Sequence, residues 1–169
     1  MADEPGAARP LVLPQLHYED PKAAVTWLCE VFGFVEESRM SGPDGTFYLA
    51  DLRGPNGGVV LVSGLGEPVK QRMRTVLGDD FQEGRDASWP NLSYSITVLV
   101  GDVDAHFKRA RNRGARVIAE PVDQPWGLRD YEVLDLEGRQ WNFSQHLRVT
   151  NPEEWGATAA TRSASDPRT

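Results

Sequence analysis

The sequence is poor in the side chains from which disulfides and metal clusters are built. Its 169 residues include a single cysteine, Cys29, and three histidines, His17, His106 and His146. One cysteine excludes an internal disulfide and a cysteine-based zinc cluster. Three histidines leave little material for a histidine-rich metal site. We interpret Cys29 as an inert thiol, His17 and His106 as structural, and His146 as a surface residue.

Long apolar runs and excess positive charge are also missing. No run approaches the roughly 20 apolar residues that a membrane-spanning helix needs. The N-terminal decapeptide MADEPGAARP is acidic and has no apolar signal segment. Lysine and arginine number 18 against 25 aspartate and glutamate residues, a net charge of −7, which argues against a broad nucleic-acid-binding face. We therefore expect a cytoplasmic globular protein with no nucleic-acid or membrane partner.

The chain does contain a repeated pattern. In the first half, the residue types predict a helix that begins at the capping Asp20 and ends at Gly33. In the second half, a helix begins at Asp102, 82 residues later, and ends at Gly114. Each helix is preceded by one predicted strand and followed by three. The predicted strands are 11–18, 34–40, 46–52 and 58–62 in the first half, and 92–100, 116–120, 129–134 and 139–144 in the second. This is an internal duplication of a βαβββ unit.

The duplication divides the chain into five segments. We expect a flexible N-terminus at 1–10 and a first module at 11–63. A linker at 64–91 carries a short predicted helix, Glu67–Leu77. The second module spans 92–147, and 148–169 is expected to be a largely disordered tail.

The duplication, together with one loop and turn, resembles a known family. Residues 125–138 read PWGLRDYEVLDLEG, with a Trp-Gly loop and an Asp-x-x-Gly turn. This is similar to the vicinal oxygen chelate superfamily, which contains glyoxalase I, extradiol dioxygenases and bleomycin resistance proteins, and in particular to its bleomycin-resistance-like branch. The resemblance covers about residues 11–147. It implies an α+β fold in which tandem βαβββ modules form a curved eight-stranded sheet or half-barrel around a cavity, with the helices outside.

The resemblance also implies where a metal ion would bind. Metal-dependent members use four strand residues, typically His, Glu, His and Glu, and these positions correspond here to Pro14, Leu61, Ser95 and Asn142. Proline and leucine offer no donor atom, and serine and asparagine are poor ligands without carboxylates beside them. We therefore predict no metal and no cofactor. Metal-free members of the family bind bulky natural products without turning them over.

Strand alternation indicates which side chains face the cavity. If Ser95 and Asn142, the last two of these metal positions, face inward, the other inward side chains of the second module are also small and polar. A hydrated cavity is then expected. On the first strand the same reasoning places Leu16 inward and His17 toward the helix. By analogy with the family, Trp126, Arg129 and Tyr131 lie near the rim, although Arg129 could instead pair with Asp130 or Asp135. The candidate ligand-binding residues are Trp126, Arg129, Tyr131, Ser93, Ser95, Thr97, Gln140, Asn142, Tyr48 and Leu16.

Three functions remain open. The first is a metal-independent protein that binds a bulky antibiotic-like molecule, cationic or planar, as a homodimer. The second is a metal-dependent lyase, isomerase or dioxygenase with an atypical site, for which Glu132, Asp51, Glu120 and His17 are the spare ligand types. The third is an interaction module that uses the fold as a dimer scaffold. The helix predicted at 67–77 could be a lid or a dimer contact.

Overall fold

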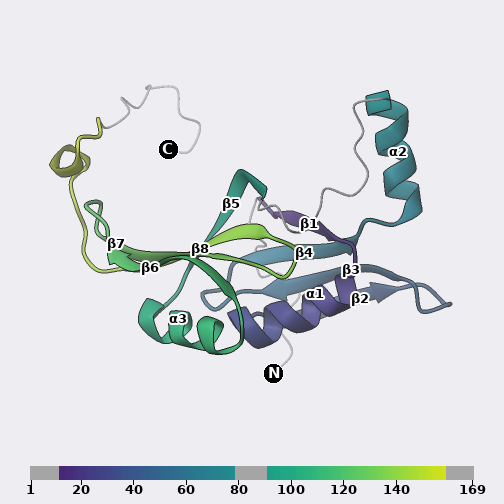
Figure 1. The fold of residues 1–169 in the computed structure, drawn as a ribbon, viewed down its shortest axis with the longest axis horizontal. Coiled ribbons are helices and arrows are strands. Elements are labelled where there is room, and N and C mark those ends of the chain that lie inside the picture. The colour runs from purple at the N-terminus through teal and green to yellow at the C-terminus, as the bar shows by residue number, and fades with distance from the viewer. Residues whose placement is uncertain (1–11, 79–90, 159–169) are drawn as a thin grey trace, which may run out of the picture.

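The computed structural model describes residues 12–78 and 91–158, and side chains of the second range from Tyr94 onward. It contains two βαβββ modules, each with one four-stranded mixed sheet (Figure 1). The first module comprises β1 (Gln15–Tyr18), α1 (Pro21–Trp27), η1 (Leu28–Phe32), β2 (Val35–Ser41), β3 (Phe47–Arg53) and β4 (Val59–Gly64). The second comprises β5 (Asn91–Leu99), α3 (Val103–Asn112), β6 (Arg116–Asp123), β7 (Leu128–Leu134) and β8 (Arg139–His146). Between them lies α2 (Glu67–Leu77), and η3 (Pro152–Trp155) follows the second module.

The two sheets have the same topology. Their strand orders are β1-β4-β3-β2 and β5-β8-β7-β6, and in each the first strand pairs in parallel with the last. The predicted tandem βαβββ fold is therefore confirmed. The described strands form two separate four-stranded sheets rather than one continuous eight-stranded sheet.

The helices begin and end where the sequence predicts. The Asp20 carboxylate accepts a hydrogen bond from the Ala23 amide at 3.0 Å, and Asp102 does the same for Ala105 at 2.9 Å. The first helix continues from α1 into a π-helical turn, η1, and stops at Gly33, whose φ of 78° lies in the left-handed region.

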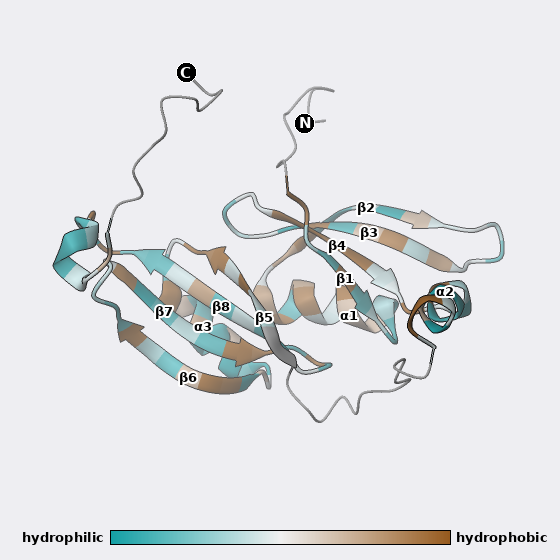
Figure 2. Cartoon of the chain, turned by 90° about the horizontal axis from the view of Figure 1, so that it is seen from above, coloured by the Kyte–Doolittle hydropathy of each residue, from teal (hydrophilic) through white to brown (hydrophobic). Residues whose placement is uncertain are grey.

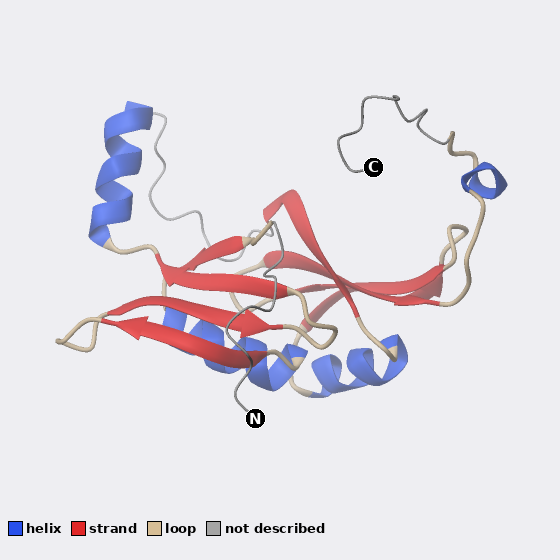
Figure 3. Ribbon diagram, turned by 180° about the vertical axis from the view of Figure 1, so that it is seen from behind, coloured by secondary structure: helices blue, strands red, loops and turns tan. Residues whose placement is uncertain are grey.

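One hydrophobic core serves both modules. The helices α1 and α3 lie end to end along the same side of the two sheets (Figure 3). Phe32 at the end of η1 packs on Trp141 and Phe143 of β8, with ring centroids 5.5 and 4.8 Å apart. All three side chains are fully buried. The modules therefore share an interior and do not fold around two separate cores.

Polar contacts also join the modules. The Tyr18 hydroxyl of β1 donates to Asp135 Oδ2 at 2.7 Å, and Asp135 is 1% exposed. Arg109 of α3 donates to the carbonyl oxygens of Cys29 and Glu30 near the end of the first helix. Arg139 donates to the carbonyl of His17 and stacks over the Tyr18 ring, 4.0 Å from its centroid.

Two elements stand away from this core. The helix α2 has no buried residue and rises on the side of the sheets opposite α1 and α3 (Figure 1). Within the predicted tail, the structure instead has the 3-10 helix η3, which is held by a capping box between Asn151 and Glu154. In the part of the chain that the structure describes, no helix is both long enough and apolar enough to cross a membrane.

Candidate ligand-binding surface

The sheet faces turned away from α1 and α3, which we call the open face, form the candidate site. Figure 2 views this side, where polar and apolar residues alternate along the strands. In β8, Trp141 and Phe143 are fully buried against the helices, so Gln140 and Asn142 point the other way. Across the second module, Thr97, Asn142 and Glu132 form one row of directly opposite residues.

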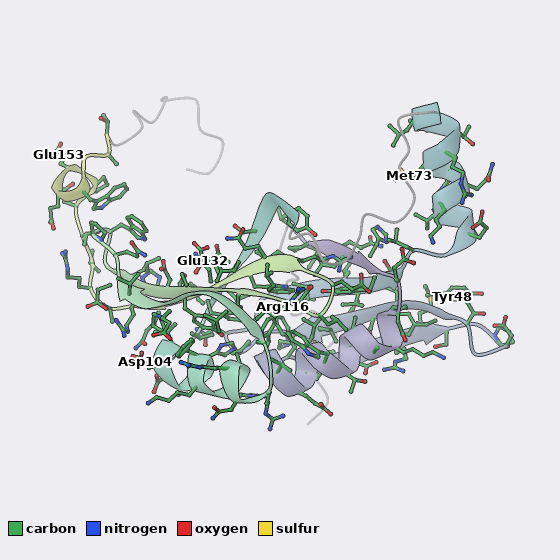
Figure 4. The ribbon with its side chains drawn as sticks, viewed as in Figure 1. Tyr48, Met73, Asp104, Arg116, Glu132 and Glu153 are labelled. Atoms are coloured by element: carbon green, nitrogen blue, oxygen red, sulfur yellow. The ribbon has the colours of Figure 1, made fainter. Side chains whose placement is uncertain are left out.

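Hydrogen bonds order this polar row. Gln140 Nε2 donates to the Glu132 carboxylate at 3.0 Å, and the Ser144 hydroxyl donates to Asn142 Oδ1 at 3.3 Å. Figure 4 shows Glu132 on the open side of the sheet and Asp104 on the helix side. These partners hold the amide and carboxylate groups in fixed directions, which is what a selective polar binding surface requires.

The second module places most of its predicted residues as expected. On β5, Ile96 and Val98 pack against the core, whereas Ser95 and Thr97 are exposed on the open face. Ser93 lies outside the described side chains.

A cavity of about 340 Å³ lies where the two modules meet. Its polar side chains are Asn56 and Thr97, and the rest of its lining is apolar side chains or glycine. This differs from the hydrated cavity that the sequence led us to expect, because the polar row lies beside the cavity and Thr97 belongs to both. The lining residues are Val12, Pro14, Phe34, Asn56, Gly58, Val59, Val60, Ile96, Thr97, Val98 and Leu99.

The first strand corrects the predicted orientation. Leu16 and Tyr18 are 5% and 0% exposed and pack in the core, so Leu16 is not offered to a ligand on the open face. Gln15 and His17 take the opposite side. The prediction failed because it fixed the inward side from the family-derived position Pro14, and packing against α1 selects the other set. The alternation of polar Gln15 and His17 with apolar Leu16 and Tyr18 was the signal that could have found this.

His17 consequently belongs to a polar group on the open face of the first module. Its Nδ1 shares a hydrogen bond with the Ser63 hydroxyl at 2.8 Å, and Gln15 Nε2 donates to the same hydroxyl at 3.1 Å. Burial lowers the pKa of His17, and nearby Arg139 lowers it further, against a hydrogen bond to the Gly64 carbonyl that raises it. A neutral imidazole is therefore favoured at neutral pH.

Two of the predicted rim residues, Tyr131 and Arg129, make structural contacts instead. Tyr131 is fully buried on the helix side, its hydroxyl 2.7 Å from His106 Nδ1, and burial raises its pKa well above the usual range. Arg129 makes two hydrogen bonds of 3.0 Å to Asp104 of α3 and one of 2.6 Å to Asp123, not to Asp130 or Asp135. These bonds lower the pKa of Asp104. Tyr131 and Arg129 therefore stabilise the packing of α3 on the sheet.

The remaining two candidates lie at the periphery. Tyr48 is 49% exposed but lies on the same side of β3 as the buried Ala50 and Leu52, so it is not part of the open face. Trp126 is 42% exposed and packs edge-to-face with Trp155, with centroids 6.4 Å apart. The open face thus brings together Ser95, Thr97, Gln140 and Asn142 and leaves out Leu16, Tyr48 and Tyr131.

The four positions of the family's metal ligands do not fit a divalent ion. Their side chains are those of Pro14, Leu61, Ser95 and Asn142, and the Pro14 carbonyl already accepts the Leu61 amide at 2.8 Å. Among residues 12–78 and 91–158, no group of three or more His, Cys, Asp or Glu side chains could hold a metal.

Sequence comparison decides the family. The model of the Glyoxalase/Bleomycin resistance protein/Dioxygenase superfamily matches residues 12–143, from before β1 to within β8. The chain belongs to this superfamily. Its two βαβββ modules are therefore the superfamily's architecture.

Two solved structures and a curated protein are similar to this chain. The crystal structure of TioX from Micromonospora sp. ML1 is 37% identical, covers 84% of this chain and 100% of that chain, and superimposes with a TM-score of 0.61. A Nocardioides glyoxalase/bleomycin resistance protein/dioxygenase is 23% identical over 88% of this chain and 91% of that chain, with a TM-score of 0.54, and supports the fold alone. An uncharacterized protein of Mycobacterium tuberculosis is 33% identical over 151 residues, 86% of this chain and 79% of that protein.

Proposed function

We propose that this protein binds a bulky small molecule on its open face without turning it over. The observation that carries the proposal is the position of Thr97, which lines the apolar cavity and also begins the polar row with Asn142 and Glu132. A cavity of about 340 Å³ has the size of a small-molecule site. An apolar or planar part of the ligand would enter the cavity, and its polar groups would bind the neighbouring row.

Charge favours a cationic ligand of the antibiotic type. Asp51 lies opposite Leu61 and Glu132 lies opposite Asn142, so the two carboxylates occupy equivalent positions in the two modules. Both point to the open side, and the chain carries a net charge of −7. We propose that the protein acts in the cytoplasm by sequestering such a molecule, in the manner of the metal-free, bleomycin-resistance-like branch.

Calorimetric titration tests this proposal. Bleomycin and daunorubicin serve as probes, because the first is bulky and cationic and the second is planar and cationic. We expect saturable binding of at least one probe, and we expect Thr97→Trp, which fills the cavity, to weaken it at least about tenfold. The matched control is Thr26→Trp, the same change at an exposed position on α1, which leaves binding unchanged. No heat with either probe, or equal loss in both variants, would contradict the proposal.

Metal analysis separates this proposal from its enzymatic alternative. The alternative, a metal-dependent lyase, isomerase or dioxygenase, draws some support from His17 and Asp51, two ligand types that lie on the open face. The protein would be purified without a chelator or affinity tag, dialysed against Ni, Zn, Mn and Fe(II), and then freed of unbound ion. We expect far less than one ion per chain. Retention of about one ion per chain would overturn the metal-independent proposal.

A further inference from the structure

The helix α2 carries an apolar stripe that is largely exposed. Val69, Met73, Val76 and Leu77 fall within about 100° of one another around the helix axis. Met73, Val76 and Leu77 are 46%, 79% and 47% exposed. An amphipathic helix gains most of its stability by packing such a stripe against another surface. The raised position of α2 does not provide that packing for these three side chains.

The connection between β4 and α2 has the features of a hinge. The Leu65 amide donates to the Tyr18 carbonyl at 2.9 Å, which fixes the end of β4 against β1. The next residue, Gly66, is the N-cap of α2, and no side chain caps the helix there. Glycine adopts a wide range of backbone angles. Among the described residues, Lys70 Nζ lies 3.4 Å from the Glu19 carboxylate, and an ion pair at the surface restrains a helix only weakly. A rotation about Gly66 can therefore move α2 as a rigid body.

The junction cavity lies within reach of such a rotation. Val59 at the start of β4 lines the cavity, and β4 extends about 17 Å from there to Gly64. The helix α2 starts just beyond Gly64 and is about 15 Å long from Glu67 to Leu77. A helix folded back along β4 would therefore bring its last turn, with Val76 and Leu77, to the cavity.

The side chains along this path match the stripe. In β4, Val59 and Leu61 lie on the open face, because the residues that alternate with them pack in the core. Residues two apart in a strand are separated by about 6.6 Å, and residues four apart in a helix by about 6 Å along the axis. Met73 and Leu77 would therefore meet Leu61 and Val59 in turn, apolar against apolar.

Charge favours the same contact. The helix α2 has a net charge of +2, whereas the whole chain has a net charge of −7. The charged residues of α2 are Glu67, Lys70, Arg72 and Arg74. Around the helix axis, Lys70 and Arg72 flank the stripe on its two sides. The open face carries the carboxylates of Asp51 and Glu132, so a positively charged helix would lie over a negatively charged surface.

We propose that α2 is a lid. In the free chain it rotates about Gly66 between the raised position seen in Figure 1 and a closed position. In the closed position the stripe lies on the open face of β4, and the last turn of α2 covers the junction cavity. Closure buries apolar surface that the raised position leaves in water. The use of such a lid, to admit a ligand and then retain it, rests on the proposed function, whereas the movement itself does not.

The distance between two spin labels measures the movement without ligand. In a Cys29→Ser background, one label is attached at Thr75→Cys, on the face of α2 opposite the stripe, and the other at His146→Cys, which is exposed at the end of β8. The raised position gives a long distance, because the two sites lie toward opposite ends of the molecule (Figure 1). Closure moves the end of α2 toward the second module and should add a population with a shorter distance. Dilution with unlabelled chains restricts the signal to distances within one molecule.

Substitutions on α2 show whether the stripe holds the closed position. Val76→Glu places a carboxylate where the last turn meets the apolar cavity, and the ratio of closed to raised chains should fall at least about fivefold. Gln71→Glu is the matched control, because it adds the same charge on the exposed polar face of α2 and should leave the ratio unchanged. Circular dichroism shows whether both variants fold.

Four outcomes would each overturn the inference. They are a single long distance in the wild type, a short distance that Val76→Glu does not reduce, an equal loss in Gln71→Glu, and a short distance that disappears on dilution. Since no ligand is present, these outcomes are independent of whether bleomycin or daunorubicin binds. Failure of the calorimetric titration would contradict the proposed function and leave the closure of α2 standing.

Discussion

At the scale of single residues, His106 shows how a side chain can join the modules. It is 9% exposed, and its Nε2 donates to the carbonyl of Phe32 at 2.8 Å. A carbonyl can only accept, so Nε2 carries the proton, and in the neutral ring Nδ1 accepts from the Tyr131 hydroxyl at 2.7 Å. The neutral imidazole satisfies both bonds together, with the Tyr131 hydroxyl as the donor to Nδ1. Burial lowers the pKa of His106, and Arg109 lowers it further, against the bond to Phe32.

The lowered pKa makes stability depend on pH. The unfolded chain takes up a proton near pH 6.5, whereas the folded chain resists it, so the free energy of unfolding rises with pH between the two values. We expect stability to be constant at mildly basic pH and to fall as the pH drops through 6.5 toward the folded pKa. The variant His106→Gln keeps a hydrogen-bond donor and an acceptor but cannot titrate. Its free energy of unfolding should therefore decrease less than that of the wild type as the pH falls. Urea unfolding at several pH values measures this, and equal slopes in both proteins would contradict it.

At the scale of elements, Gly127, which directly precedes β7, allows its loop to pack closely against the C-terminal segment. Its φ is 85°, and a Cβ atom there would lie 2.4 Å from the backbone oxygen of Arg148. Its carbonyl accepts from the Leu147 amide at 2.9 Å. The Trp-Gly loop is therefore a backbone contact point as well as a turn, because only a residue without a side chain lets the two segments approach this closely.

Alanine substitutions separate the stability cost of a left-handed backbone conformation from the cost of the close contact between Gly127 and Arg148. Gly57 has a similar φ of 88° but open space around it. We expect Gly57→Ala to cost about 1 kcal/mol from strain alone, and Gly127→Ala to cost about 2–4 kcal/mol because residues near Arg148 must also move. Chemical denaturation gives both values, and hydrogen exchange should show faster exchange in η3 of Gly127→Ala only. Equal costs at the two sites would show that the close contact is unimportant.

At the scale of the whole molecule, the shared core predicts one cooperative unit. Phe32 of the first module packs on Trp141 and Phe143 of the second, and Asp135 accepts hydrogen bonds from both Tyr18 and Trp141. Phe32→Ala should therefore destabilise the chain by about 3–5 kcal/mol and increase amide exchange in β7 as much as in β3. Unfolding followed by circular dichroism and by tryptophan fluorescence should coincide. Two separate transitions would mean that the modules fold independently.

Much of the fold could be predicted because its signals are local. Asp20 and Asp102 cap helices through bonds to amides three residues away, and Gly33 ends a helix through its own backbone conformation. The helix predicted between the modules has the observed bounds Glu67–Leu77. Such features depend on a few neighbouring residues, so the chain specifies them without knowledge of the rest of the structure.

Alternation around the family-derived positions Ser95 and Asn142 predicted the open face of the second module, but the same reasoning placed Leu16 of β1 on the wrong side. Strands β5 and β8 place Ser95, Thr97 and Asn142 on the open face, as their alternation with apolar residues predicts. Tyr131 was assigned from the family resemblance alone. Its alternation with Glu132 and burial beside Phe143 place it on the helix side, with the two rings stacked at 5.5 Å. For Tyr131, the family resemblance indicated a position near the site but not the face of the strand on which its side chain lies.

The sequence by itself determined the duplicated βαβββ architecture and the helix boundaries, because both follow from residue types at short spacing. Only the tertiary structure decided that Asp135 joins the modules. It also decided that the cavity is mainly apolar. These features depend on which surfaces pack together over long sequence separations: Tyr18 and Asp135 lie 117 residues apart in the chain yet 2.7 Å apart in space. Packing of the helices against both sheets selects these contacts, and no local pattern encodes it.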